Sequence, residues 1–380
     1  MLHRSLCLAI ALSNALTVTS LAAQVAVHRS APRGVVSIPA QGTTVPLLSG
    51  MRPIVHVTIN GHGPFRMLVE TGSLISYLLP GPYAATFGAD TARPADKVRI
   101  GDATITGITI RRNARLGVPG IDGLIGLDAL YDAAITIDFP VGTLTLSRDT
   151  LPAANGRDVL TLGVASLFWT VPLMLGDTPV NAIIDTQSAL SISSAPSRAQ
   201  GLAFTTAPVP VGRARGPTIG NVIVQRARLA ASARLGDAEL QQPLIDLLPL
   251  ASPLPQDAFI LGLQVLTHFA VTIDQRVGRA RFARLERVVP APPPAYATGL
   301  GATRRRDGLH VVLSVLENSA AAEAGLQPGD VILRVDGREA SGMSDVEWYN
   351  SIGGRVPLRL RVLRNSQELD VTLTPRYLGF

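Results

Sequence analysis

Apolar and polar residues alternate in short runs along most of the chain that follows Thr44. A side-chain period of two is typical of β-strands with one buried face, and β-branched residues are common in these runs. The glycines and prolines, 35 and 28 of 380 residues, supply the turns that many short strands need. The pattern predicts a mainly β protein. Its clearest strands are 44–48, 54–59, 65–69, 134–139 and 143–146.

Two hairpins follow from the same pattern. Asn60-Gly61 lies between two predicted strands, and this dipeptide favours a two-residue turn because both central positions need positive φ. Residues 98–110 alternate in the same way and predict a second hairpin pair.

Three features recur in the same order, about 115 to 140 residues apart. They are an apolar strand that ends in an acidic triplet, an apolar pair followed by glycine, and a closing hairpin. The two sets lie at 65–72, 124–126 and 134–146, and at 180–187, 260–262 and 270–283. An internal repeat of this kind predicts two structurally similar halves.

The first of these stretches resembles the active-site hairpin of retropepsin-like aspartic proteases. The resemblance rests on the Asn60-Gly61 turn, Gly63-Pro64 and the apolar strand that leads to Glu70-Thr71-Gly72-Ser73. The second triplet, Asp185-Thr186-Gln187, is followed by Ser188. The resemblance implies two lobes, 44–148 and 160–285, that face each other as a pseudo-dimer.

In that family two carboxyls share one proton and activate a water, without a metal or any other cofactor. By resemblance, Glu70 and Asp185 are the catalytic pair. Thr71 and Thr186 would brace the two loops across the interface, with Gly72 and Gln187 beside them. Ser73 and Ser188 would donate to the outer carboxylate oxygens, and Gly126 and Gly262 would leave room for the neighbouring strand. Residues 98–110 would form a flap over the cleft.

Both triplets depart from the family pattern of Asp-Thr-Gly. Glu70 has one more methylene than aspartate, so its carboxyl is expected to move by about 1.5 Å. Gln187 replaces a glycine and would be strained by roughly 1–2 kcal/mol if its φ were positive. Two functions therefore stay open. One is an aspartic endopeptidase, and the other is an inactive pseudoprotease that binds extended polypeptide.

The C-terminal part has a different composition. A proline-rich linker is predicted at 286–297. The stretch Leu326 to Gly337 closely resembles the signature of bacterial PDZ domains, and the resemblance covers 298–375. It implies that backbone N–H groups of Gly299, Leu300, Gly301 and Ala302 hold the carboxylate of a peptide C-terminus. Arg304, Arg305 and Arg306 would strengthen that attraction or simply form a solvated hairpin tip.

Two short helices are predicted in this part. One spans Ser319 to Ala324 and ends at Gly325, a residue suited to a left-handed cap. The other starts at Ser344, which is spaced from Glu347 as in a capping box.

Composition and charge exclude other classes. The net charge is +6, but the arginines are scattered and no aromatic residues alternate with them, so nucleic acid is not an expected partner. The six histidines are dispersed, and neither HExxH nor GxSxG occurs, so no metal is expected. The expected partners are polypeptides and peptide C-termini. Pairing of lobes within one chain favours a monomer, and a swapped dimer is the alternative.

Residues 1–23 read as a signal peptide. They combine a basic start, an apolar run at 6–16 and small residues at Ala22-Ala23. The single cysteine, Cys7, lies within this segment. The sequence thus predicts an exported protein, periplasmic or secreted, with an uncleaved membrane anchor as the alternative.

Overall fold

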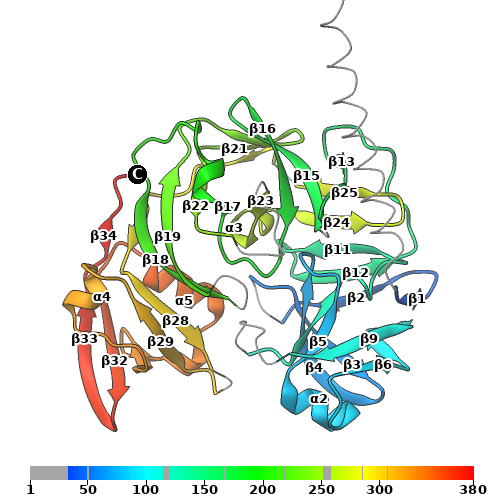
Figure 1. Ribbon diagram of the computed structural model, residues 1–380, viewed down its shortest axis with the longest axis horizontal. Coiled ribbons are helices and arrows are strands. Elements are labelled where there is room, and N and C mark those ends of the chain that lie inside the picture. Colours follow the sequence, from blue (N-terminus) through cyan, green and yellow to red (C-terminus); the bar gives the residue numbers. More distant parts are fainter. Residues whose placement is uncertain are drawn as a thin grey trace, which may run out of the picture.

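The computed structural model describes residues 33–48, 51–113, 120–166, 168–216, 220–250, 258–284, 286–305 and 307–380. The predicted signal peptide, Cys7 and Arg306 lie outside the described residues. Within the described ranges, no helix is long and apolar enough to cross a membrane. The protein is mainly β, as predicted. It has two curled half-barrel sheets and a smaller C-terminal domain (Figure 1).

The first half barrel is a sheet of nine strands within the described part of the chain, in the order β1-β8-β7-β3-β4-β10-β5-β9-β6. The helix α2 (Pro80–Phe87) follows β5. The strands are β1 (Val35–Ser37), β3 (Ile54–Ile59), β4 (His62–Glu70), β5 (Ser76–Leu78), β6 (Ala92–Ala95), β7 (Val98–Ile100), β8 (Ala103–Thr106), β9 (Ile108–Arg112) and β10 (Gly123–Gly126).

The second half barrel follows the order β18-β19-β22-β17-β23-β16-β15-β20-β21-β26, and β14 pairs with β15. The short helices η1 (Pro196–Arg198) and α3 (Leu263–Leu266) belong to this half. The strands are β14 (Gly163–Ala165), β15 (Phe168–Leu175), β16 (Thr178–Ile184), β17 (Ile192–Ser194), β18 (Val209–Gly216), β19 (Gly220–Arg228), β20 (Ala233–Leu235), β21 (Ala238–Leu240), β22 (Leu244–Leu247), β23 (Phe259–Leu261) and β26 (Val288–Val289).

The two half barrels share one topology. The run β7-β3-β4-β10-β5-β9 corresponds strand for strand to β20-β15-β16-β23-β17-β22. The directions also agree, because β10 runs parallel to β4 as β23 does to β16, and β5 runs parallel to β9 as β17 does to β22. The internal repeat that the sequence predicted is therefore present in the fold.

A third sheet joins the halves. Its order is β13-β25-β24-β11-β12-β2, so three strands of the second half continue into three strands of the first, with β24 paired to β11 at the junction. At its centre Thr136 lies opposite Thr272, and their hydroxyl oxygens are 2.9 Å apart. The strands are β2 (Thr43–Pro46), β11 (Ala134–Asp138), β12 (Thr143–Ser147), β13 (Val159–Thr161), β24 (Ala270–Asp274) and β25 (Arg279–Ala283).

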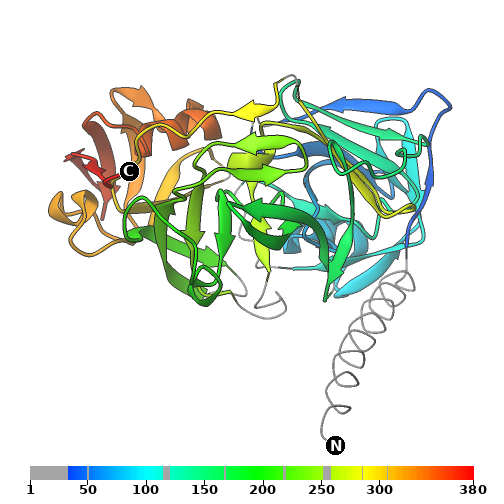
Figure 2. The same cartoon turned by 90° about the horizontal axis from the view of Figure 1, so that it is seen from above.

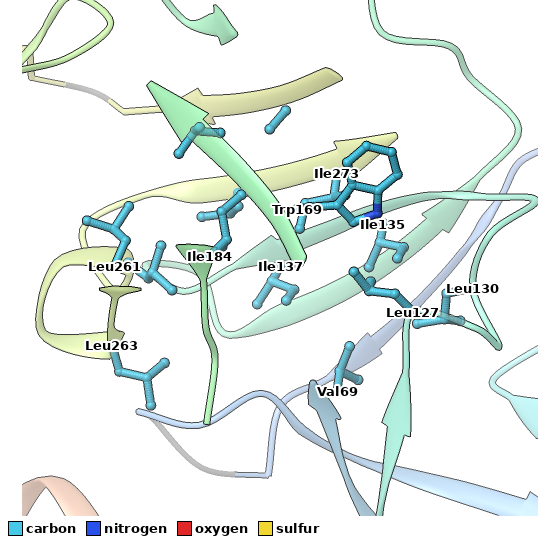
Figure 3. Close-up of a cluster of buried hydrophobic side chains, with 14 of the residues drawn as sticks. Val69, Leu127, Leu130, Ile135, Ile137, Trp169, Ile184, Leu261, Leu263 and Ile273 are labelled. Carbon is cyan, nitrogen blue, oxygen red and sulfur yellow. The ribbon is translucent and has the colours of Figure 1, made fainter. Parts of the chain in front are cut away.

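One hydrophobic cluster runs through both halves. Figure 3 shows side chains of the first half packed against those of the second. Those labelled are Val69, Leu127, Leu130, Ile135 and Ile137 from the first half, and Trp169, Ile184, Leu261, Leu263 and Ile273 from the second. Because core and sheet are both shared, each half depends on the other for burial of its apolar face.

The predicted hairpins differ in outcome. Asn60 and Gly61 have φ values of 51° and 81°, so the tight turn has the expected backbone. In contrast, the flap predicted at 98–110 is wrong. β7 and β8 form a hairpin that is bonded into the sheet between β3 and β1, and the N–H of Asp102 at its tip donates to Thr43 Oγ1 at 3.0 Å. It has no free end that a flap needs.

The C-terminal domain has its own core. Its sheet has the order β28-β29-β30-β32-β33, with β31 on β30. The capping box between Ser344 and Glu347 is present at the start of α5, and Gly325 has a φ of 73°, as predicted. The elements are β28 (Leu300–Arg304), β29 (His310–Val315), α4 (Ala320–Glu323), β30 (Val331–Val335), β31 (Arg338–Glu339), η2 (Ala340–Gly342), α5 (Asp345–Ile352), β32 (Leu358–Arg364) and β33 (Gln367–Leu373).

The predicted linker packs against the second half barrel rather than spanning open solvent. β26 lies within it and pairs with β21, and Arg228 donates to the carbonyl of Pro293 at 2.9 Å. β27 (Tyr296–Ala297) pairs with β34 (Arg376–Tyr377), so the last strand returns to the linker. The C-terminal domain therefore lies beside the second half barrel, where β18 contacts β28 and β29 (Figures 1 and 2).

Candidate active site and peptide-binding edge

The structure brings Glu70 and Asp185 together at the interface of the two halves. Glu70 is the last residue of β4, and Asp185 directly follows β16, the equivalent strand of the second half. A Cβ atom placed on Gly72 would lie 3.0 Å from Glu70 Oε1 and 3.2 Å from Asp185 Cγ. The two carboxyls therefore border the same small space, although 114 residues separate them in the chain.

Backbone N–H groups hold both carboxyls. Gly72 donates to Glu70 Oε1 at 2.7 Å. Gln187 and Ser188 donate to Asp185 Oδ1 at 2.8 and 3.1 Å. Because two N–H groups on one carboxylate favour its charged form, Asp185 is the better placed of the pair to ionise.

Burial raises the pKa of Glu70 well above its usual value, and the neighbouring charge of Asp185 raises it further. Burial also raises the pKa of Asp185, but the N–H groups of Gln187 and Ser188 and a hydrogen bond with the Glu70 side chain oppose that rise. These directions favour Glu70 as the protonated member of the pair and Asp185 as the ionised one.

The two oxygens of Glu70 differ in their surroundings. Oε1 accepts the N–H of Gly72. Oε2 is buried and lacks a hydrogen-bond partner among the described residues. The longer side chain of glutamate therefore still places its carboxyl beside Asp185 at the interface of the two halves.

Thr71 and Thr186 link the two loops. The Thr71 hydroxyl donates to the carbonyl of Ile184 at 2.7 Å, and the Thr186 hydroxyl donates to that of Val69 at 2.7 Å. Each hydroxyl also accepts the backbone N–H of the other threonine, at 3.0 and 3.2 Å. These buried bonds form the symmetric brace that the sequence led us to expect.

The expected role of the Ser73 hydroxyl is wrong, and Ser188 contacts its carboxylate by a different group. The Ser73 hydroxyl donates to the carbonyl of Ile75 at 3.0 Å rather than to Glu70, because the loop turns back on itself at this point. Ser188 reaches Asp185 through its backbone N–H. Neither Gly72 nor Gln187 has a positive φ, so Gln187 carries no left-handed strain. Gly72 leaves space beside the two carboxyls because it has no side chain.

The repeated glycines lie where the chain passes very close. A Cβ atom on Gly126 would lie 2.8 Å from both the nitrogen and the oxygen of Ile75, and one on Gly262 would lie 2.4 Å from the oxygen of Leu190. The crowding comes from the loop that follows each triplet rather than from the triplet strand itself. Glycine at these two positions therefore lets each loop pack beside its carboxyl.

Asp128 was not identified as a site residue from the sequence. Its Oδ1 accepts the Ser76 hydroxyl at 2.8 Å, and its Oδ2 accepts the Ser76 N–H at 3.2 Å. The only signal was its place two residues after Gly126, which by itself gives no chemistry. Among the described residues there is no group of three or more His, Cys, Asp or Glu side chains that could hold a metal ion.

The predicted carboxylate loop lies at the start of β28. Gly299 has a φ of 74°, and its carbonyl accepts the N–H of Leu316 at 2.9 Å. Leu300 is buried in the domain core, and Gly301 and Ala302 continue the strand. β28 is bonded to β29 on one side and is the edge strand of its sheet within the described residues.

The arginines after the loop belong to a hairpin. Arg304 donates to the carbonyl of Ser341 at 3.0 Å, and Arg305 forms an ion pair with Asp307 at 2.9 Å. These contacts favour the hairpin-tip interpretation over an anion-binding role.

Comparisons with known proteins concern the C-terminal part. A family model described as a PDZ domain matches residues 311–364. The metalloprotease MmpA of Caulobacter vibrioides is 36% identical over 62 residues, which is 16% of this chain and 16% of that protein. The mitochondrial serine protease HTRA2 of Drosophila willistoni is 35% identical over 66 residues, 17% of this chain and 15% of that protein.

A longer match is to the regulator of sigma-E protease RseP of Salmonella typhimurium, 31% identical over 150 residues, 39% of this chain and 28% of that protein. Among solved structures, the HtrA3 PDZ domain bound to a phage-derived ligand is 30% identical and covers 18% of this chain and 62% of that chain, with a TM-score of 0.16. The chain spans less than a third of the length of the curated relatives it matches.

The chain therefore contains a PDZ domain and is distantly related, through that region, to proteases. The matched proteases are named for metal-dependent and serine chemistry. Because one kind of shared domain accompanies different chemistries, the matches do not transfer a catalytic class to this chain.

Proposed function

We propose that this protein is an aspartic-type endopeptidase with two retropepsin-like lobes, in which Glu70 and Asp185 activate a water molecule. The observation that carries the proposal is the buried carboxyl pair, which backbone N–H groups from both halves hold at one place. Burial and the neighbouring charge of Asp185 raise the pKa of Glu70, which supports a single proton on the pair. A shared proton gives one acid and one base in the same site, which is the requirement for hydrolysis of a peptide bond without a covalent intermediate.

The roles follow from the protonation. Ionised Asp185 takes a proton from the water, whose oxygen attacks the peptide carbonyl carbon. Glu70 gives its proton to the carbonyl oxygen as the tetrahedral intermediate forms. When the C–N bond breaks, the leaving amine takes the proton from Asp185, and the intermediate's hydroxyl returns a proton to Glu70. The pair thus ends each cycle with the single proton it started with.

The PDZ domain is assigned to substrate capture. An extended peptide can add to a sheet edge, and β28, which begins directly after Gly299, is the edge strand of its sheet within the described residues. The match of residues 311–364 to the PDZ family model supports a peptide C-terminus as the partner. The anchored linker holds the PDZ domain close to the second half barrel. A substrate whose C-terminus is bound by the PDZ domain would therefore be kept near the carboxyl pair.

We also place the protein outside the cytoplasm, because residues 1–23 read as a signal peptide. Fractionation of cells that express the full chain, with sequencing of the mature N-terminus, tests this separately from the activity.

The test of the activity is Asp185→Asn. This variant keeps the size of the side chain and removes the base, so cleavage of an unfolded polypeptide should fall by at least about a hundredfold. Asp177→Asn is a matched control, because Asp177 is exposed in the turn between β15 and β16 and should cleave at the unmodified rate. New amino termini in the products measure the rate.

Equal cleavage by the unmodified chain and Asp185→Asn would overturn the proposed chemistry. If the unmodified chain bound polypeptide and cleaved none, the pseudoprotease interpretation would replace the endopeptidase.

A further inference from the structure

We infer that Asp128 is a positioning residue for Glu70. The charge of the Asp128 carboxyl sets the geometry of the first active-site loop, so this loop responds to pH. The inference rests on the proposed function for its catalytic consequence, although its structural part can be tested without turnover.

A short chain of hydrogen bonds connects Asp128 to Gly126, the residue that lies opposite Glu70 in the neighbouring strand. Asp128 accepts both the hydroxyl and the N–H of Ser76. The Ser76 hydroxyl oxygen in turn accepts the N–H of Gly126 at 3.1 Å. Gly126 is the direct partner of Glu70 in the parallel pairing of β10 with β4. Asp128 thus holds the strand that lies beside the catalytic glutamate.

The second half solves the same structural problem with a different residue. Ser191 is the counterpart of Ser76, and its N–H donates to Asp246 Oδ2 at 3.0 Å. Asp246 comes from β22 and is held by Arg226 at 2.7 Å. The position equivalent to Asp128 is Gln264, which donates to the carbonyl of Ala189. A carboxylate therefore supports the loop in each half, and of the two only Asp246 has an arginine partner among the residues that the structure describes.

The surroundings of Asp128 leave its charge state open to pH. Burial raises its pKa from the usual 3.8 to about 6, and the hydrogen bonds from Ser76 and Ala129 only partly oppose this. Tyr77 on β5 is the ionisable group that interacts with it electrostatically. Arg33 precedes Gly34, whose N–H donates to the Asp128 carbonyl, but its guanidinium lies over the Tyr131 ring.

The raised pKa of Asp128 determines how stability changes with pH. Because the pKa is higher in the folded state, the fold binds the proton more tightly, and the contribution of Asp128 to stability falls as pH rises from about 4 to about 6. Over the same range the carboxylate becomes charged, and its two bonds to Ser76 become charge-assisted and stronger. The ionised form of Asp128 therefore holds the loop more firmly, although the folded protein is less stable in that form.

Asp128→Asn tests the inference, with Asp177→Asn as the matched change of charge. The thermal midpoint of the unmodified chain should fall between about pH 4 and 6 more steeply than that of Asp128→Asn. The carboxyl ¹³C resonance of Glu70 should show a step near pH 6 that the variant lacks. kcat should fall by about tenfold at pH 7 with KM nearly unchanged, because a looser first loop would displace the Glu70 carboxyl and not the bound substrate.

Identical pH profiles for Asp128→Asn and the unmodified chain would overturn the inference, and so would an equal effect of Asp177→Asn. The midpoint and the resonance need no substrate. If the unmodified chain cleaved nothing, the proposed function would fail while these two readouts still decided the role of Asp128.

Discussion

At the scale of the residue, the site depends on one methylene group. Glu70 reaches both the N–H of Gly72 and the side chain of Asp185, and it does so from the end of a buried strand. A glutamate at this position is therefore compatible with a shared proton. The length of the side chain and the shape of the loop have to match, and in this chain they do.

Glu70→Asp should consequently lower activity, even though aspartate is the usual residue in retropepsin-like proteases. The carboxyl would retract by about 1.5 Å from Asp185. A displacement of this size costs on the order of a hundredfold in kcat. Steady-state kinetics on the variant, alone and together with Gln187→Gly, measure the effect. If activity appeared only in the double variant, the natural chain would be a pseudoenzyme.

The residue scale also shows what sequence can and cannot predict. Glu70, Asp185 and the two threonines follow from the triplet pattern, because strand ends in a repeat occupy equivalent places. The hydroxyl of Ser73 was assigned wrongly, since its partner depends on how the loop folds back to Ile75. Asp128 acts on Ser76 through a contact between separate segments, which spacing along the chain does not reveal.

At the scale of the element, the threonine brace ties β4 to β16. Thr71 and Thr186 are buried, and each satisfies a carbonyl and an N–H of the other loop. Removal of one hydroxyl leaves buried polar groups without partners, and this is the costly case for hydrogen bonds.

Thr186→Val should therefore lower the free energy of unfolding by about 1–3 kcal/mol. Thr44→Val is the matched control, because Thr44 also pairs with a threonine hydroxyl but on an exposed surface, and it should change stability by less than about 0.5 kcal/mol. Denaturant titration measures both. A similar loss in the two variants would mean that the brace contributes nothing special.

Strand positions and hairpin partners were predictable, but partners distant in the chain were not. Alternation located β3, β7 and β8 closely, since it reports which face of a strand is buried. It gave no sign that the β7–β8 hairpin is inserted between β3 and β1, because any neighbour with an apolar face satisfies the pattern. The flap assignment was wrong for that reason.

At the scale of the whole molecule, the two halves form one unit. They share a six-stranded sheet and one core, and each supplies one member of the carboxyl pair. The repeat in the sequence predicted two similar halves, and the topology repeats as expected. The repeat did not predict that the two closing hairpins pair edge to edge, because the pairing of β11 with β24 is determined by tertiary packing.

The pH dependence of cleavage tests whether Glu70 and Asp185 share one proton in a water-activating site. The rate should rise as Asp185 ionises and fall as Glu70 loses its proton. Both limbs should lie above the values of ordinary carboxyls, because burial raises the pKa of each group. The profile of the full chain on an unfolded polypeptide, measured from about pH 3 to 8, should therefore be bell-shaped. An absence of turnover at every pH would contradict this chemistry. A profile with one limb at the pH of an unperturbed carboxyl would contradict the raised pKa values on which it rests.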